Sequence, residues 1–256
     1  MTLVRVLDAE ALKMKRTVAL KLVVLCPAVV VLLILFVTSQ APFTTLKRNG
    51  GENEWTVLAS LTLRVWATLM MPLYITLETA LMAGLDHSEN QWKSLLARPV
   101  PRWTLYVAKL MVVMAMTATS TLVLLCGILI DGAVLPRLRS ELVFGFPVPW
   151  AAIFRDGAQV VGLAFLALTI QHWVSLRWRS FTVATGTGIV AMVAGVVAVA
   201  AAQQTGGWPQ YFPWALPMLV LAKQPQHIAA ALFVSSALGL VVAAAGCLDF
   251  CRREVN

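Results

Sequence analysis

The residue types that most often carry out chemistry are few in this 256-residue sequence and are scattered along it. His87, His172 and His227 lie too far apart for any two to reach one metal ion from a single helix, and the four cysteines form no C-x-x-C pair. No serine stands in a G-x-S-x-G motif, and no glycine is followed by lysine, as a P-loop requires. The sequence therefore predicts no enzyme, no ATP hydrolysis and no cofactor in this chain itself.

Several charged side chains instead fall within long apolar stretches, where an ionisable residue usually marks a paired or functional position. Arg64 has two interpretations that stay open: a charge on a substrate path or an interface between two chains, or a side chain that reaches the outer headgroups. Glu78 either pairs with Lys109 in the following apolar stretch or contacts a substrate. Arg155 and Asp156 open another stretch and are expected to be interfacial anchors.

The apolar stretches themselves indicate membrane spans. The chain is 59% hydrophobic and only 12% charged, whereas a soluble domain is about 25% charged. Six stretches reach the roughly 20 residues that cross a bilayer as a helix; they cover residues 17–38, 56–84, 103–130, 150–176, 181–202 and 228–250. The second is long enough to require tilt or a kink at Pro72. We expect an all-α integral membrane protein with a single domain, residues 1–256.

The distribution of positive charge predicts the orientation. Thirteen of the 20 Lys and Arg residues lie in the termini and in the loops that follow the second and fourth spans, against five in the other loops. Because cytoplasmic segments carry the excess of positive charge, both termini are expected in the cytoplasm of a cell whose inner (plasma) membrane holds the protein. The net charge of +8 thus needs no nucleic-acid partner.

Two segments outside the spans have patterns of their own. Residues 1–16 place apolar residues at helical spacing, which predicts an amphipathic helix on the inner leaflet; these are Leu3, Leu7, Ala11 and Met14. Residues 203–227 form an outer loop that is rich in aromatic, apolar and proline residues. A solvated loop would not carry so many apolar side chains, so we expect a broken, re-entrant segment that packs against the spans.

Two short spacings predict local contacts within the spans. Ala184 and Gly188 are small residues four positions apart, which favours close packing against another helix. Asp249, near the end of the sixth span, is expected to pair with Arg252 or Arg253.

The loop between the second and third spans carries the most informative pattern, DHSENQWKSLLARPVPRWTLYVAK from Asp86 to Lys109. Ser88 followed by Gln91 matches a capping box, which predicts the start of a short helix. Pro99 ends that helix because it disfavours helical backbone at the preceding residue. Trp92, Leu95 and Leu96 share one face, and this apolar face requires a membrane surface or a protein partner.

This pattern resembles the six-span permeases of type-2 (exporter-type) ABC transporters, especially the lantibiotic-immunity and bacitracin-resistance group. Those proteins share an acidic residue, a Trp-Lys-x-Leu-Leu stretch, a Pro-Val-x-Arg stretch and a Lys that opens the third span. In that family the segment, here residues 86–100, is a coupling helix that seats in a groove of the ATPase subunit. The resemblance implies that ATPase-coupling residues are Asp86, Glu89, Trp92, Lys93, Leu95, Leu96, Arg98 and Arg102.

The resemblance also implies a mechanism, alternating access driven by a separate pair of ATPase subunits that bind ATP and Mg²⁺. A second permease copy or a paralogue would complete the path for an amphipathic or hydrophobic cargo, such as a peptide antibiotic or a lipid-like molecule. One alternative is an ion-coupled secondary transporter, for which Glu78 is the candidate ion site. Another is a membrane enzyme, but no convergent nucleophile, base or metal ligands are visible in the sequence.

Overall fold

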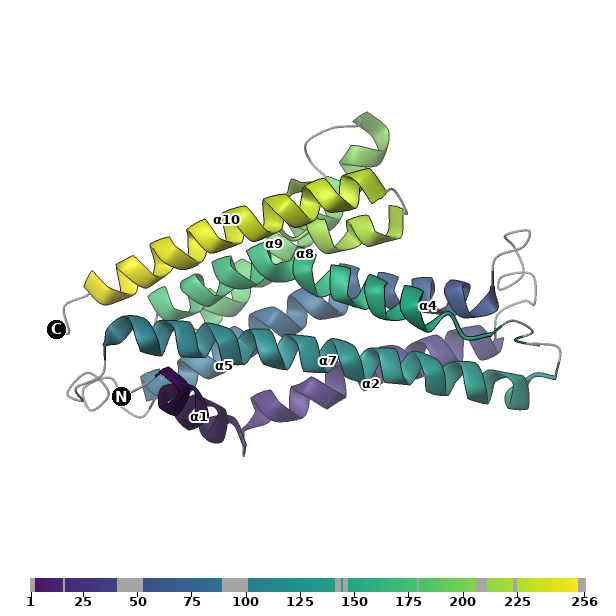
Figure 1. Cartoon of the computed structure of the whole chain (residues 1–256), viewed down its shortest axis with the longest axis horizontal. Helices are drawn as coiled ribbons and strands as arrows, with labels where there is room; N and C mark the ends of the chain where they lie inside the picture. The colour runs from purple at the N-terminus through teal and green to yellow at the C-terminus, as the bar shows by residue number, and fades with distance from the viewer. Residues whose placement is uncertain are drawn as a thin grey trace.

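The computed structural model describes residues 3–15, 17–40, 53–88, 101–140, 144, 147–178, 180–205, 211–222 and 225–252, and within these ranges it contains helices and no strand (Figure 1). The α-helices are α1 (Leu3–Met14), α2 (Val18–Gln40), α4 (Glu54–Val65), α5 (Met71–Ser88), α7 (Arg102–Leu138), α8 (Trp150–Arg177), α9 (Phe181–Thr205) and α10 (Pro225–Arg252). A π-helical turn, η1 (Trp66–Met70), joins α4 to α5, and a 3-10 helix, η3 (Leu216–Ala222), precedes α10.

Six helices are long and apolar enough to cross a membrane, which confirms the expected all-α fold with six spans. The second of them runs continuously through α4, η1 and α5. The third, α7, continues to Leu138 instead of ending near Ile130. Because hydropathy sums over about 20 residues, the spans are the part of the fold that composition alone predicts best.

The spans divide into a central and a peripheral set. About 50% of the apolar window is buried in α4–α5, in α7 and in α8, against 22–28% in α2, α9 and α10. The peripheral helices pack along the central ones: α2 packs on α7, α9 on α5 and α10 on α8. Their exposed Val, Leu and Phe side chains suit lipid, which is as apolar as they are.

The chain ends share one end of the bundle. Figure 1 shows α1 beside the beginning of α7, and the last turns of α10 at this same end. We call this end, where α5 and α8 also finish, the inner end, and the opposite end the outer end. An even number of spans requires this arrangement.

The long second span contains its irregularity just before Pro72. The N–H of Met71 donates to the carbonyl of Trp66, the i→i+5 pattern of a π-helical turn. Trp66 is fully buried there, donates from Nε1 to Thr121 Oγ1 at 3.3 Å and packs on Tyr74 with ring centroids 6.2 Å apart. The turn is therefore fixed by a tertiary contact with α7 and by packing on a residue of the same span.

Residues 211–222 fold back against the outer half of the bundle. Residues 214–220 are buried, and η3 contacts α8, α10 and α4. Trp214 lies against Gly195 of α9, where an added Cβ would meet its Cβ at 2.9 Å. The aromatic and apolar residues of this part of the expected outer segment are thus used in packing; residues 206–210 and 223–224 of that segment lie outside the described residues.

The expected close packing at Ala184 and Gly188 is confirmed. Both residues are buried on α9, and a Cβ atom added to Gly188 would overlap the hydroxyl and methyl groups of Thr76 on α5. Thr76 has little freedom to move away, because its Oγ1 donates to the carbonyl of Pro72 at 2.8 Å. By contrast, a Cβ added to Gly186 meets nothing within 4 Å.

These two glycines give a matched test of the α5–α9 contact. Gly188→Ala should lower the free energy of unfolding by about 1–3 kcal/mol, the usual effect of overpacking. Gly186→Ala should leave it unchanged or raise it by up to about 1 kcal/mol, since alanine favours helix over glycine. Thermal unfolding of both variants in mild detergent measures the difference. Equal melting temperatures would contradict the packing of α9 on Thr76.

Candidate functional site

The coupling segment implied by the sequence lies between two spans that contact each other, α5 and α7. α5 continues past Gly84 and ends at Ser88, so the expected N-cap residue is the last helical residue of α5 and Asp86 lies in its final turn. Arg102 is the first residue of α7. The other coupling residues, Glu89, Trp92, Lys93, Leu95, Leu96 and Arg98, lie outside the described residues.

α1 packs on α7 through a face that contains most of the expected apolar residues: Met14 is buried, and Leu3 and Leu7 are partly buried against the core. The buried residues of α1 are Val6, Glu10 and Met14, while Ala11 is exposed. The sequence pattern placed Ala11 on the apolar face, which is wrong, and it assigned no position to Glu10. A charge on α7 draws Glu10 into the interface.

That charge is Lys109. Its Nζ lies 2.5 Å from Glu10 Oε2, and both side chains are only 2% exposed. Lys13 Nζ approaches the other carboxylate oxygen of Glu10 at 2.8 Å and is 30% exposed. The partner of Lys109 is therefore Glu10 and not Glu78 as expected, and the pair fixes α1 to the first two turns of α7, directly after the coupling segment.

Further polar contacts join the inner ends of α7, α8 and α10. Arg102 Nη1 donates to the carbonyl of Cys251 at 3.2 Å, which links the start of α7 to the end of α10. On the other side of α10, Asp249 accepts from Trp173 Nε1 at 3.1 Å and lies 3.9 Å from Arg177 Nε. The sequence predicted Arg252 or Arg253 as the partner of Asp249. It did not predict these contacts of Asp249 with α8.

Aromatic packing adds further contacts between the inner ends of α7, α8 and α10. Tyr106 of α7 lies edge-on to His172 of α8, with ring centroids 4.9 Å apart, and 5.9 Å from the ring of Phe250 on α10. Gly246 of α10 sits against the Tyr106 ring, so that an added Cβ would reach its Cζ at 3.1 Å. We call α1 with the inner ends of α7, α8 and α10 the inner foot. These contacts connect the inner ends of α7, α8 and α10.

The two charges expected inside the second span have opposite environments. Glu78 is fully buried, and neither of its carboxylate oxygens has a hydrogen-bond partner among the described residues. Its electrostatic neighbours are Tyr74, one turn away, and Cys26 of α2. Arg64 is exposed on α4. Their roles as substrate or interface contacts stay predictions.

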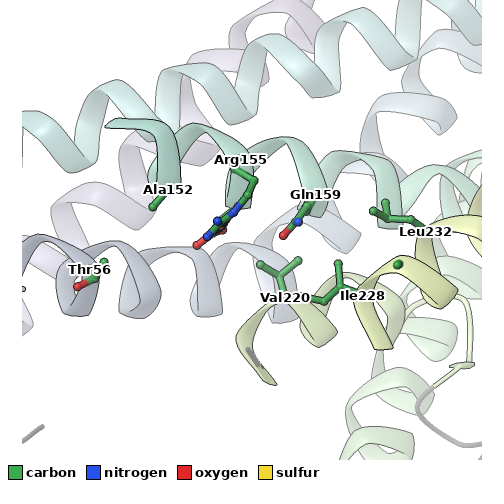
Figure 2. Close-up of a pocket in the computed structure, with 9 residues that line it drawn as sticks. Thr56, Ala152, Arg155, Gln159, Val220, Ile228 and Leu232 are labelled. Carbon is green, nitrogen blue, oxygen red and sulfur yellow. Dashed lines mark hydrogen bonds and ion pairs between the residues drawn. The ribbon is translucent and has the colours of Figure 1, made fainter. Parts of the chain in front are cut away.

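A cavity of about 500 Å³ opens at the outer end, between α4, α8, η3 and α10 (Figure 2). It is lined by Thr56, Ala152, Arg155, Asp156, Gln159, Val220, Ile228, Ala229 and Leu232. Arg155 Nη2 lies 3.0 Å from Asp156 Oδ1, and Arg155 Nε donates to the same oxygen at 3.1 Å. The sequence assigned Arg155 and Asp156 to the membrane interface but gave no sign of the cavity, because η3 and α10 are distant in the chain.

Within the described ranges, no three His, Cys, Asp or Glu side chains group together so that they could hold a metal ion. The arrangement of the described helices offers three candidate functional features. It provides a loop between two packed spans, a charged inner foot and an outer cavity with one cation and one anion.

A family model for ABC-2 family transporter proteins matches residues 6–198, from α1 to most of α9. The matched region includes the segment from Asp86 to Lys109. No curated protein and no solved structure matches the chain.

Proposed function

The chain belongs to the ABC-2 family of transporter proteins and is the membrane-spanning permease subunit of an ABC transporter; on that premise we propose that it is the permease of an exporter driven by a separate pair of ATPase subunits. One observation carries the proposal. The family match spans the loop with the Trp-Lys-x-Leu-Leu pattern, and this loop joins α5 to α7, two spans in contact.

The proposed coupling begins in the cytoplasm, at the inner end. Trp92, Leu95 and Leu96 insert the apolar face of the coupling helix into a groove of the ATPase, and the charged coupling residues contact its rim. ATP binding closes the ATPase pair and moves this helix. Since the helix is followed directly by α7, the movement reaches α1 through the Lys109–Glu10 pair and α10 through Arg102.

Two permease copies, or this chain and a paralogue, would enclose the path and alternate between inward and outward access. An amphipathic or hydrophobic cargo, such as a peptide antibiotic or a lipid-like molecule, suits the apolar spans and the aromatic outer segment. In this scheme ATP and Mg²⁺ bind to the ATPase subunits. The assignment to the bacitracin-resistance and lantibiotic-immunity group is part of the same proposal.

The proposal expects an ATPase subunit to be encoded beside this chain, and co-expression with that subunit tests the function. We expect the two to copurify in detergent through a tag on the permease, and reconstituted vesicles to release or accumulate cargo only when ATP is supplied on the ATPase side. If no ATPase copurifies and an ion gradient drives transport, the exporter proposal fails. Loss of that gradient-driven transport in Glu78→Gln would then assign the chain to the ion-coupled secondary transporters.

A further inference from the structure

The outer cavity combines a charged end with an apolar wall. Arg155, Asp156 and Gln159 come from α8, and Figure 2 shows Arg155 and Gln159 directed into the space between α4 and the start of α10. Val220 of η3 and Ile228 of α10 form part of the opposite side. A ligand that fills this space meets both polar and aliphatic atoms, which is the chemistry of an amphiphile.

The ion pair in the cavity leaves both of its charges available. The Arg155 side chain is 65% exposed and that of Asp156 is 34% exposed. Both contacts between them use Nε and Nη2 of the guanidinium and end on the same oxygen, Oδ1. Among the described residues, the Nη1 group of Arg155 and Oδ2 of Asp156 are therefore open to a ligand, one as a charged donor and the other as a charged acceptor.

The cavity lies at the depth of lipid headgroups. α8 has 28 residues and is therefore about 42 Å long, whereas the hydrocarbon core of a bilayer is about 30 Å thick. Arg155 and Asp156 stand in the second turn from the outer end of α8, so they lie near the boundary between headgroups and hydrocarbon. Leu232, two turns into α10, lies deeper and would meet the chain of a bound amphiphile.

We propose that this cavity binds a zwitterionic amphiphile, whose anionic group contacts Arg155, whose ammonium group contacts Asp156, and whose apolar chain lies along Val220, Ile228 and Leu232. The charges that line the cavity are one cation and one anion. A purely anionic headgroup would have to bind Arg155 beside the Asp156 carboxylate, which repels it. A headgroup with both charges places its anionic group beside Arg155 and its ammonium group beside Asp156, so that four charges of alternating sign lie next to one another. The site does not depend on ATP-driven export.

Lipid binding to the purified full chain, followed by native mass spectrometry in detergent, tests the proposal without any ATPase. The probes are phosphatidylethanolamine, which is zwitterionic; phosphatidylglycerol, which is anionic; and diacylglycerol, which has the chains alone. We expect phosphatidylethanolamine to bind at least about tenfold tighter than the other two, the ratio typical of one charge-assisted hydrogen bond. Soluble glycerophosphoethanolamine, the headgroup alone, should not displace it at equal concentration.

Variants assign the binding to the cavity. Arg155→Gln and Asp156→Asn should each remove the preference for phosphatidylethanolamine, and the exchange Arg155→Asp with Asp156→Arg should restore part of it. Ala229→Phe keeps the ion pair and fills the cavity from α10, so it should weaken binding of the same lipid by a similar factor. Arg137→Gln changes an exposed arginine of α7 at the outer end that does not line the cavity, and should change nothing.

Four results would overturn the proposal. If phosphatidylglycerol binds the wild-type chain more tightly than phosphatidylethanolamine, the cavity is an anion site. If all three lipids bind with equal affinity, or if Arg137→Gln changes the lipid preference as Arg155→Gln does, the lipid binds nonspecifically around the spans. Unchanged lipid preference in both Arg155→Gln and Ala229→Phe would place the binding elsewhere. Melting temperatures of all variants identify any that fail to fold.

Discussion

Lys109→Met should destabilise the protein by up to about 3–5 kcal/mol, the cost of removing one partner of a buried ion pair; Lys13 stays beside the other oxygen of Glu10 and offsets only part of this cost, because it is 30% exposed. The pair joins α1 to α7, with an Nζ–Oε2 distance of 2.5 Å and 2% exposure of each side chain. Methionine keeps the length and apolar volume of the lysine stem, so the variant removes the charge with little change in packing. Denaturant titration and thermal unfolding in mild detergent measure the loss.

Two further variants separate the charge from the packing. Lys13→Met removes the other cation beside the same carboxylate, but this side chain is 30% exposed and its loss should cost at most about 1 kcal/mol. The double variant Glu10→Leu with Lys109→Met should recover most of the stability lost in Lys109→Met, because an apolar pair needs no desolvation of charges. A double variant as unstable as the single one would show that Lys109 is held by contacts other than Glu10.

The sequence predicted the scaffold far better than its contacts. All six spans are found close to their expected positions, because each rests on the sum of many apolar residues. The small-residue spacing at Ala184 and Gly188 was also informative, since close approach of two helices excludes larger side chains. Both signals are local, and neither depends on which helices become neighbours.

The partner of Lys109 shows why contacts are harder to predict. Consecutive antiparallel spans are usually neighbours, and that rule favoured Glu78. Glu10 is 99 positions away in sequence and lies in a helix whose pattern of apolar residues did not single it out. Glu10 is buried because the packing of α1 on α7 brings it to Lys109. The spacing of apolar residues within residues 1–16 carries no information about that packing.

The outer cavity was missed for a similar reason. Arg155 and Asp156 stand where interfacial anchors are common, so their sequence position had an ordinary explanation. The cavity exists because Val220 of η3 and Ile228 of α10 lie opposite Arg155 and Asp156, although they are more than 60 residues further along the chain. A polar group at positions 155, 156 and 159, all within the second and third turns of one span, was the only available signal.

Replacing Trp92 and Leu96 together by aspartate should abolish copurification of the ATPase, with at least about a tenfold loss. Trp92 and Leu96 lie four positions apart, on one face of the predicted coupling helix. A tryptophan inserted in a partner groove is the residue type that most often dominates binding energy. An aspartate there would be buried without a partner, at a cost of several kcal/mol per charge, and about 1.4 kcal/mol corresponds to a tenfold change in affinity.

The matched control carries the same two charges on the other face. Asn90 and Ser94 are also four positions apart, but helical geometry places them opposite Trp92 and Leu96. Asn90→Asp with Ser94→Asp should keep copurification within about twofold of the wild type, since these aspartates would face solvent. Equal loss in both double variants would mean that added negative charge repels the ATPase, whichever face carries it. Full copurification in both would move the interface away from this helix, and the charged inner ends of α1 and α10 would become the surfaces to change next.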